Sequence, residues 1–262
     1  MDNVNHWING QDLEASRHLP VTNPATGETI RQVADGNADT VKAAIDAAQA
    51  AFPAWRDTPP AKRAQVMYRF KALLERDADR LVQLISEEHG KTLEDAMGEL
   101  KRGIENVEYA CGVPELLKGE YSHNAGPAID TWSNHQPLGI VAGITPFNFP
   151  AMVPLWMYPM ALACGNAFIL KPSEQVPSAA LKMAELLTEA GLPDGLFSVV
   201  HGDREVVEAL IDAPDVKAVS FVGSTPVAKA IYQRGAENGK RVQALGGAKN
   251  HAVVLADADI DN

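Results

Sequence analysis

The chain has 262 residues, 46% of them hydrophobic, which is enough to bury a sizeable core in one or two domains. Its 34 acidic residues outnumber 23 basic ones, and the formal net charge of −11 excludes a surface built for nucleic-acid phosphates or anionic lipid. No apolar stretch reaches about 18 residues, and the N-terminus shows no signal-peptide pattern. Two cysteines and seven scattered histidines offer no zinc-ligand spacing. We expect a cytoplasmic protein without nucleic-acid, membrane or metal partners.

Residues 1–36 alternate short β-prone runs with turn residues, as a small hairpin arm does. Helix signals then fill residues 37–117, where we expect a mainly helical layer. The expected helices run from a cap at Asn37 or Asp39 to Phe52, from Pro59-Pro60 to Glu75, and over 77–88 and 93–117. Within 118–136, the alternating run AIDTWSNHQ predicts an isolated β excursion suited to pairing with a partner subunit.

Residues 137–262 change character, because short buried-strand runs alternate with helical stretches. The runs are GIVAGI, AFILK, LFSVV, AVSFV and AVVL, with helices expected over 151–164, 177–190, 203–212 and 225–236. This alternation predicts βαβ units and a Rossmann-like parallel sheet. Ligands bind beyond the carboxyl ends of such strands, so the strand exits are the candidate site.

The first exit reads Thr145-Pro146-Phe147-Asn148-Phe149-Pro150. Two prolines stiffen this segment, and the amide of Asn148 is suited to donate a hydrogen bond to a developing oxyanion. The alternative is structural: Asn148 caps the next helix and Pro150 occupies its first turn.

The second exit, Leu170-Lys171-Pro172-Ser173-Glu174, sets a cation and a carboxylate three residues apart at a rigid turn. Lys171 is suited to donate to ribose hydroxyls, and Glu174 to accept from them. The alternative is a surface ion pair without functional consequence.

The third exit, Phe221-Val222-Gly223-Ser224-Thr225-Pro226, allows close backbone approach at the glycine. Ser224 begins a helix whose free N–H groups favour an anion such as a pyrophosphate. The sequence lacks the GxGxxG fingerprint, and a capped turn is the alternative. The three exits together carry more weight than any one alone.

The stretches GITPFNFP, GNAFILKPSE, AGLPDGLFSVVHG, SFVGST and LGGAKNH, in this order and spacing, resemble the aldehyde dehydrogenase superfamily over nearly the whole chain. Phe147 before Asn148, together with GAKNH at 247–251, is similar to the CoA-acylating methylmalonate-semialdehyde dehydrogenases. The resemblance implies that Asn148 is the oxyanion donor. It implies NAD-contacting roles for Thr145, Phe147, Lys171, Glu174, Gln175 and Ser224.

Hydrolytic members of the superfamily carry a glutamate just before Leu-Gly-Gly, where this sequence has Ala244. No carboxylate is available there to deprotonate water, whereas a thiol needs less help as a nucleophile. Ala244 therefore favours coenzyme A as co-substrate. The implied reaction is thiolate attack on methylmalonate or malonate semialdehyde, hydride transfer to NAD, loss of CO2, and formation of propionyl-CoA or acetyl-CoA, as in valine or thymine breakdown.

A semialdehyde of this class carries a carboxylate, for which Arg102 in GELKRGIENVEYA is a candidate bidentate partner. A solvated helix charge is the alternative. Cofactor choice leans to NAD because Glu174 would repel a 2'-phosphate and the next residue, Gln175, is neutral.

The family's nucleophilic cysteine lies beyond GAKNH in a later catalytic domain, so we expect it to be absent from this chain. Cys111 and Cys164 are interpreted as buried structural residues. We expect a homo-oligomer for the full-length enzyme. Two alternatives remain: an NAD-dependent aldehyde dehydrogenase that releases a free acid, and a non-catalytic NAD-binding or assembly fragment.

Overall fold

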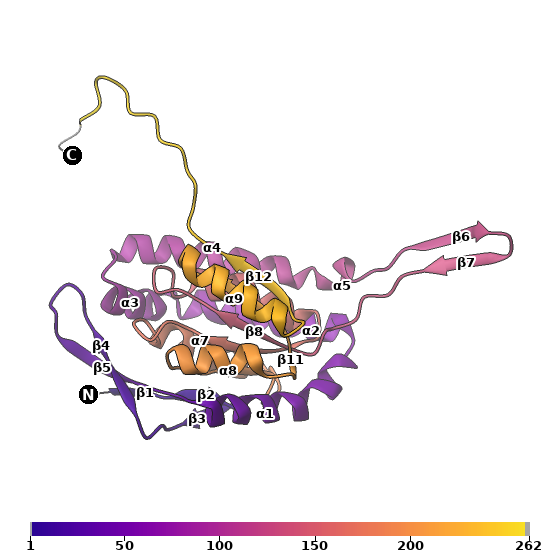
Figure 1. Ribbon diagram of the computed structural model, residues 1–262, viewed down its shortest axis with the longest axis horizontal. Helices are drawn as coiled ribbons and strands as arrows, with labels where there is room; N and C mark the ends of the chain where they lie inside the picture. The colour runs from indigo at the N-terminus through magenta and orange to yellow at the C-terminus, as the bar shows by residue number, and fades with distance from the viewer. Residues whose placement is uncertain (1, 260–262) are drawn as a thin grey trace.

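The computed structural model describes residues 2–259 as a layered α/β protein (Figure 1). Residues 1 and 260–262, the outer ends of the predicted arm and of the Rossmann-like segment, lie outside the described residues. The main sheet has seven strands in the order β12-β11-β8-β9-β10-β2-β3. Its parallel strands are β8 (Ile140–Ile144), β9 (Ala167–Lys171), β10 (Phe197–Val199), β11 (Val216–Val222) and β12 (Arg241–Leu245).

Helices connect the parallel strands, as the alternating pattern predicts. They are α6 (Met152–Ala163), α7 (Ser178–Glu189), α8 (Arg204–Asp212) and α9 (Thr225–Glu237). β8 and β9 are buried along their whole length, which explains why their sequences are continuous apolar runs. The predicted Rossmann-like fold class is confirmed. No helix among residues 2–259 is both long and apolar enough to cross a membrane.

The N-terminal arm contains two hairpins. They are formed by β2 (His6–Ile8) with β3 (Gln11–Leu13), and by β4 (His18–Thr22) with β5 (Thr29–Ala34); β1 (Asp2–Val4) pairs parallel to β5. The first turn uses Asn9 and Gly10 with φ of 54° and 75°, as a tight two-residue hairpin loop requires. β2 also pairs antiparallel with β10, so the arm is continuous with the main sheet.

The helical layer consists of α1 (Ala38–Arg56), α2 (Pro60–Arg76), α3 (Ala78–His89), α4 (Leu93–Cys111) and the short α5 (Val113–Leu116). Asn37 caps α1 in a reciprocal capping box with Thr40. The predicted end of this helix at Phe52 is wrong, because α1 continues through Pro53 to Arg56. Burial of Trp55, whose indole N–H donates to the carbonyl of Leu162 at 2.8 Å, stabilises the extra turn.

A two-stranded hairpin, β6 (Tyr121–Gly126) with β7 (Ile129–Trp132), projects away from the body of the molecule (Figure 1). The hairpin lies within the excursion predicted at 118–136, and β7 covers only part of the run AIDTWSNHQ. The predicted strand at 252–255 is wrong: that segment has no regular structure, and Val253 is 87% exposed. The fifth parallel strand is β12 instead. As an edge strand it alternates exposed and half-buried residues, so its sequence RVQAL lacks the apolar run typical of a central strand.

Candidate functional site

The three candidate exits follow adjacent strands of the main sheet, β11, β8 and β9. Ile144 pairs with Lys171 on one side and with Phe221 on the other, so the carboxyl ends of these strands lie level. From β8 the chain proceeds to β9 and β10 on one side, and later crosses back to β11 and β12 on the other. The crevice at such a reversal is the usual ligand site of an open parallel sheet.

At the first exit, the backbone of Thr145 is tied to the second exit by a hydrogen bond from its N–H to the carbonyl of Lys171, at 3.1 Å. The ring of Phe147 is 49% exposed and stacks on His89 with centroids 6.3 Å apart. Asn148 is exposed, and within residues 2–259 nothing hydrogen-bonds to its side-chain amide. The N-cap of α6 is Ala151, so the interpretation of Asn148 as a helix cap is wrong.

A carboxylate from the helical layer replaces the missing cap. Glu99 of α4 is fully buried, and its Oε1 accepts the N–H groups of Ala151 and Met152 at 2.8 and 3.2 Å. Its other oxygen pairs with the ammonium of Lys91, which also donates to the carbonyl of Asn148 at 2.9 Å. The sequence interpretation missed both residues. A signal was available, because Glu99 falls on the buried stripe of α4 between Ala96 and Gly103.

At the second exit, Lys171 and Glu174 contact each other, with Nζ and Oε2 2.9 Å apart. The side chain of Lys171 is only 7% exposed and that of Glu174 36% exposed, so this is not the surface pair of the structural alternative. Gln175 is exposed on the following turn. The half-exposed carboxylate presents acceptor oxygens backed by a buried cation, an arrangement suited to hydroxyl groups of a sugar.

At the third exit, Ser224 is the N-cap residue of α9, but its side chain makes no capping hydrogen bond. Both Ser224 and Thr225 are exposed, and the hydroxyl of Thr225 accepts the N–H of Gly247 at 3.0 Å. The 13-residue helix α9 therefore begins with uncapped donors and the positive end of its dipole. An anionic group is favoured there.

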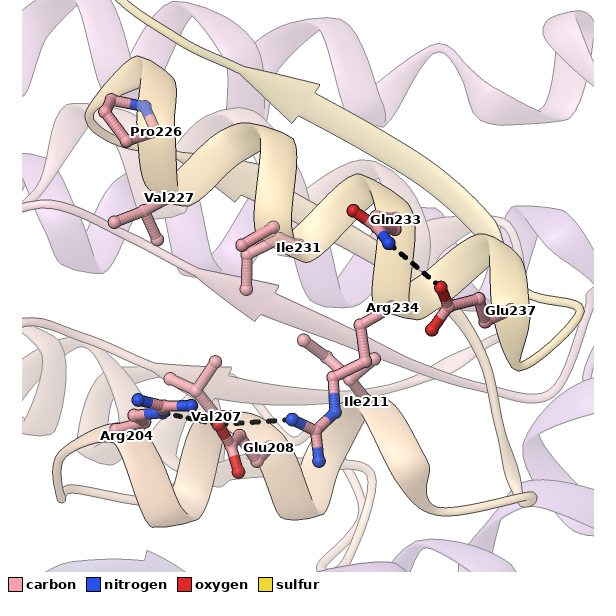
Figure 2. Close-up of a pocket in the computed structure, with 11 residues that line it drawn as sticks. Arg204, Val207, Glu208, Ile211, Pro226, Val227, Ile231, Gln233, Arg234 and Glu237 are labelled. Carbon is pink, nitrogen blue, oxygen red and sulfur yellow. Dashed lines mark hydrogen bonds and ion pairs between the residues drawn. The ribbon is translucent and has the colours of Figure 1, made fainter.

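A groove between α8 and α9 continues from this helix start (Figure 2). Its volume is about 690 Å³. Its apolar lining comes from Val207, Ile211, Val227 and Ile231, and Pro226 stands at one end. Glu208 bridges Arg204 and Arg234, and all three side chains also line the groove. The sequence interpretation did not identify this groove, although α8 carries more apolar residues than one buried stripe needs.

Arg102 extends from α4 toward the first exit. It is exposed, and its guanidinium carbon lies 5.9 Å from the centroid of the Phe149 ring, next to Asn148 in the chain. An exposed guanidinium beside the candidate oxyanion donor is able to bind a carboxylate.

The cysteines of the described chain are not activated. Cys111 is buried and Cys164 partly buried, and burial raises the pKa of both thiols above its ordinary value. Residue 244, at the end of β12 beside β11, contributes only a methyl group. Among residues 2–259, no group of three or more His, Cys, Asp or Glu side chains is arranged to hold a metal ion.

The order of the strands defines an open, mostly parallel α/β sheet, with three polar strand exits gathered where the strand order reverses and the exposed amide of Asn148 at one of them. The family model described as the aldehyde dehydrogenase family matches residues 7–262. The chain belongs to the aldehyde dehydrogenase family, and the resemblance inferred from its motifs is confirmed.

Similar proteins carry a narrower description. A malonate-semialdehyde dehydrogenase of Pseudomonas aeruginosa is 67% identical over 263 residues, covering 100% of this chain and 53% of that protein. A solved methylmalonate-semialdehyde dehydrogenase of Oceanimonas doudoroffii superposes with a TM-score of 0.96 at 64% identity, over 100% of this chain and 54% of the other.

A second solved structure, of a Sinorhizobium meliloti protein described as a methylmalonate-semialdehyde dehydrogenase complexed with NAD, gives a TM-score of 0.95 at 49% identity. It covers 100% of this chain and 54% of the other. The chain thus spans about half the length of the relatives it matches.

Proposed function

We propose that this chain forms the NAD-binding portion of a CoA-acylating dehydrogenase for methylmalonate or malonate semialdehyde. The observation that carries the proposal is the alignment of three neighbouring strand exits, bearing Asn148, the Lys171–Glu174 pair and Ser224. Beyond the last exit, the α8–α9 groove offers an apolar slot for a flat base. One dinucleotide laid across these features meets each of its chemical parts in turn.

Each part of NAD has a partner of suitable chemistry. The adenine would lie in the groove beside Val227 and Ile231, and the pyrophosphate at the start of α9. A ribose would hydrogen-bond to Glu174 and Lys171. The nicotinamide would then lie toward Asn148, where NAD accepts a hydride from the substrate.

The substrate side of the proposal rests on Asn148 and Arg102. The free amide of Asn148 would donate to the oxygen of the aldehyde as it becomes an oxyanion. Arg102, beside Phe149, would bind the carboxylate of the semialdehyde and so hold its aldehyde near that amide. The nucleophilic thiol is supplied by neither Cys111 nor Cys164, whose pKa values are raised.

Ala244 favours coenzyme A over water as the acyl acceptor, because no carboxylate at the end of β12 is available to deprotonate water. Propionyl-CoA or acetyl-CoA would then be formed after loss of CO2. A dehydrogenase that releases the free acid is the second candidate. Assay of a complete enzyme containing this chain, with and without CoA, distinguishes the two candidates. If the enzyme without CoA forms the free acid as fast as the enzyme with CoA turns over, the proposal is contradicted.

Calorimetric titration of the purified chain tests the NAD site. We expect one molecule of NAD to bind per chain, and NADP to bind more weakly. Because Glu174 neutralises much of the charge of Lys171, discrimination against the 2'-phosphate of NADP depends on this carboxylate remaining in place. Glu174→Gln leaves Lys171 free to attract a 2'-phosphate. The ratio of the Kd for NADP to the Kd for NAD should therefore fall by roughly tenfold.

Glu185→Gln, which alters an exposed partner of Lys182 on α7, is the matched control and should leave the ratio unchanged. A chain that folds but binds neither nucleotide is an assembly fragment and not an NAD-binding module.

A further inference from the structure

The last residue of α3 and the loop that follows it contact three consecutive residues of the first exit. His89 stacks on Phe147, and Lys91 donates to the carbonyl of Asn148. The same ammonium lies 4.5 Å from the centroid of the Phe149 ring, within the range of a cation–π interaction. This loop therefore holds the backbone of Asn148 from outside the Rossmann-like segment.

Glu99 fixes the other end of the same segment. Its carboxylate accepts N–H groups of Ala151 and Met152 and pairs with Lys91. The buried carboxylate of Glu99 thus links Lys91, which is hydrogen-bonded to Asn148, to the start of α6 three residues further along the chain. Among the described residues, no other side chain hydrogen-bonds to the backbone of Asn148.

Stability alone is a weak reason to bury this pair. The side chain of Glu99 is 0% exposed and that of Lys91 9% exposed, so both charges lose most of their hydration. Replacing a buried ion pair by neutral groups of similar volume is often neutral or stabilising. A pair of this kind is better explained by the geometry that it specifies.

We propose that Lys91 and Glu99 are positioning residues, which fix the backbone of Asn148 and leave its side-chain amide free to face a ligand. Both act through the backbone of this segment, to which their hydrogen bonds are made. The catalytic meaning of this position rests on the proposed function, whereas the positioning itself is a property of the folded chain and is measured without NAD.

The test uses the double variant Lys91→Met/Glu99→Gln in the isotope-labelled chain, studied by NMR. The amide oxygen introduced at position 99 still accepts the N–H groups that begin α6, and no unpaired charge is left buried. We expect the carbonyl carbon signal of Asn148 to shift and fast backbone motion of residues 147–149 to increase, since a hydrogen bond from a charged donor to this carbonyl is lost. The side-chain NH2 signals of Asn148, identified by their loss in Asn148→Ala, should shift.

Two single variants serve as controls. Lys101→Met removes an exposed lysine from α4, the helix that carries Glu99, and should change neither measurement. Lys91→Arg keeps a cationic donor and should preserve the backbone motion of the parent. Unchanged backbone motion and unchanged Asn148 signals in the double variant would overturn the proposal. So would motion that increases equally in β9 and β10, because the pair would then serve general stability.

The proposed function and the positioning role can be contradicted independently of each other. Adding NAD to the parent chain and finding no change in the Asn148 signals contradicts the proposed function. The effect of the double variant without NAD is unaffected by that result.

Discussion

Arg102 is the residue on which substrate specificity depends in this account. Its guanidinium lies beside Phe149 in the segment that follows β8, and it is exposed. The competing interpretation, a solvated helix charge, predicts no role in catalysis. The two differ in what they predict for substrates with and without a carboxylate.

In a complete enzyme containing this chain, Arg102→Leu should raise the KM for malonate semialdehyde by roughly tenfold to a hundredfold, as expected for a lost hydrogen bond between charged groups. The KM for propanal, which has no carboxylate, should change little. Lys101→Leu on the same helix is the control. Steady-state kinetics on both aldehydes decide the question, and equal increases for the two substrates remove the assignment.

A buried histidine pair lies at the fourth strand exit, after β10. His6 and His201 stack with centroids 5.9 Å apart, and the backbone N–H of His201 donates to Nδ1 of His6 at 3.1 Å. Burial, and next the charge of His18, lower the pKa of His6 to about 4. Burial, then His6 and Lys171, lower the pKa of His201 to about 3. Both rings are neutral in the folded protein at neutral pH.

These lowered pKa values predict a loss of stability on acidification. The unfolded chain takes up protons as the pH falls through about 6.5, while the folded chain does so only near 4 and below, so stability is lost across this window. From pH 7.5 to 5, His201→Leu should lose about 2 kcal/mol less than the parent in urea unfolding. Burial also raises the pKa of Glu88 to about 6, but its opposite effect is common to both proteins.

The exposed His135 provides the control, because His135→Leu should retain the pH dependence of the parent. A His201→Leu variant with that same dependence would show that His201 already titrates normally in the folded chain.

At this scale, the sequence predicted the residues that stand at strand exits. Asn148, Lys171 and Ser224 are visible because proline, glycine or a helix start marks where each strand ends. Lys91 and Glu99 were missed. The place of Glu99 on the buried stripe of α4 indicates its burial, but not its partners at the start of α6, because that contact joins residues about 50 positions apart.

The helices α6 and α7 are each clamped at both ends by the helical layer. Glu99 accepts the first N–H groups of α6, and Glu88 accepts the N–H and hydroxyl of Ser178 at the start of α7. At the other ends, Arg63 of α2 donates to the carbonyl of Ala163 at 2.8 Å, and Arg69 to that of Ala190 at 2.6 Å. Carboxylates thus lie at the N-terminal ends and guanidinium groups at the C-terminal ends, as the helix dipoles favour. These contacts fix the two helices that follow β8 and β9.

Removing one clamp should destabilise the chain. Glu88→Ala leaves the N–H of Ser178 without its partner and deprives Arg31 of a buried carboxylate. We expect a loss of roughly 3 kcal/mol in the free energy of unfolding, measured in urea. Glu87→Ala removes the exposed partner of the same arginine and should cost less than about 1 kcal/mol. Similar losses in the two variants would show that the cap of α7 contributes little.

Most elements were predictable from local signals, because capping residues and prolines mark the helix starts and buried apolar runs mark the central strands. The two errors in the strands have one physical cause. Apolar content identifies a strand only when both of its faces are covered. β12 has one exposed face and went unrecognised, whereas 252–255 is apolar and pairs with no strand in the described chain.

At the scale of the whole molecule, the β6–β7 hairpin is the feature that the core does not explain. Tyr121 and Trp132 are cross-strand partners, and their side chains are 64% and 74% exposed. Exposed aromatic residues on a projecting hairpin suit an interface between subunits. The homo-oligomer expected for the complete enzyme remains a prediction.

In that enzyme, Tyr121→Ser/Trp132→Ser should lower the oligomeric state measured by sedimentation velocity, because the apolar surface of the hairpin is lost. Tyr109→Ser alters an equally exposed aromatic on α4 and should leave assembly intact. Unchanged sedimentation of the double variant would assign the interface to another surface.

The central claim is that the exits of β11, β8 and β9 bind one dinucleotide. A crystal structure of the chain grown with NAD tests it most directly. We predict adenine between α8 and α9, a ribose within hydrogen-bond distance of Glu174, and the nicotinamide on the side of Asn148. NAD bound on any other surface, or contacting only one of the three exits, would contradict the account.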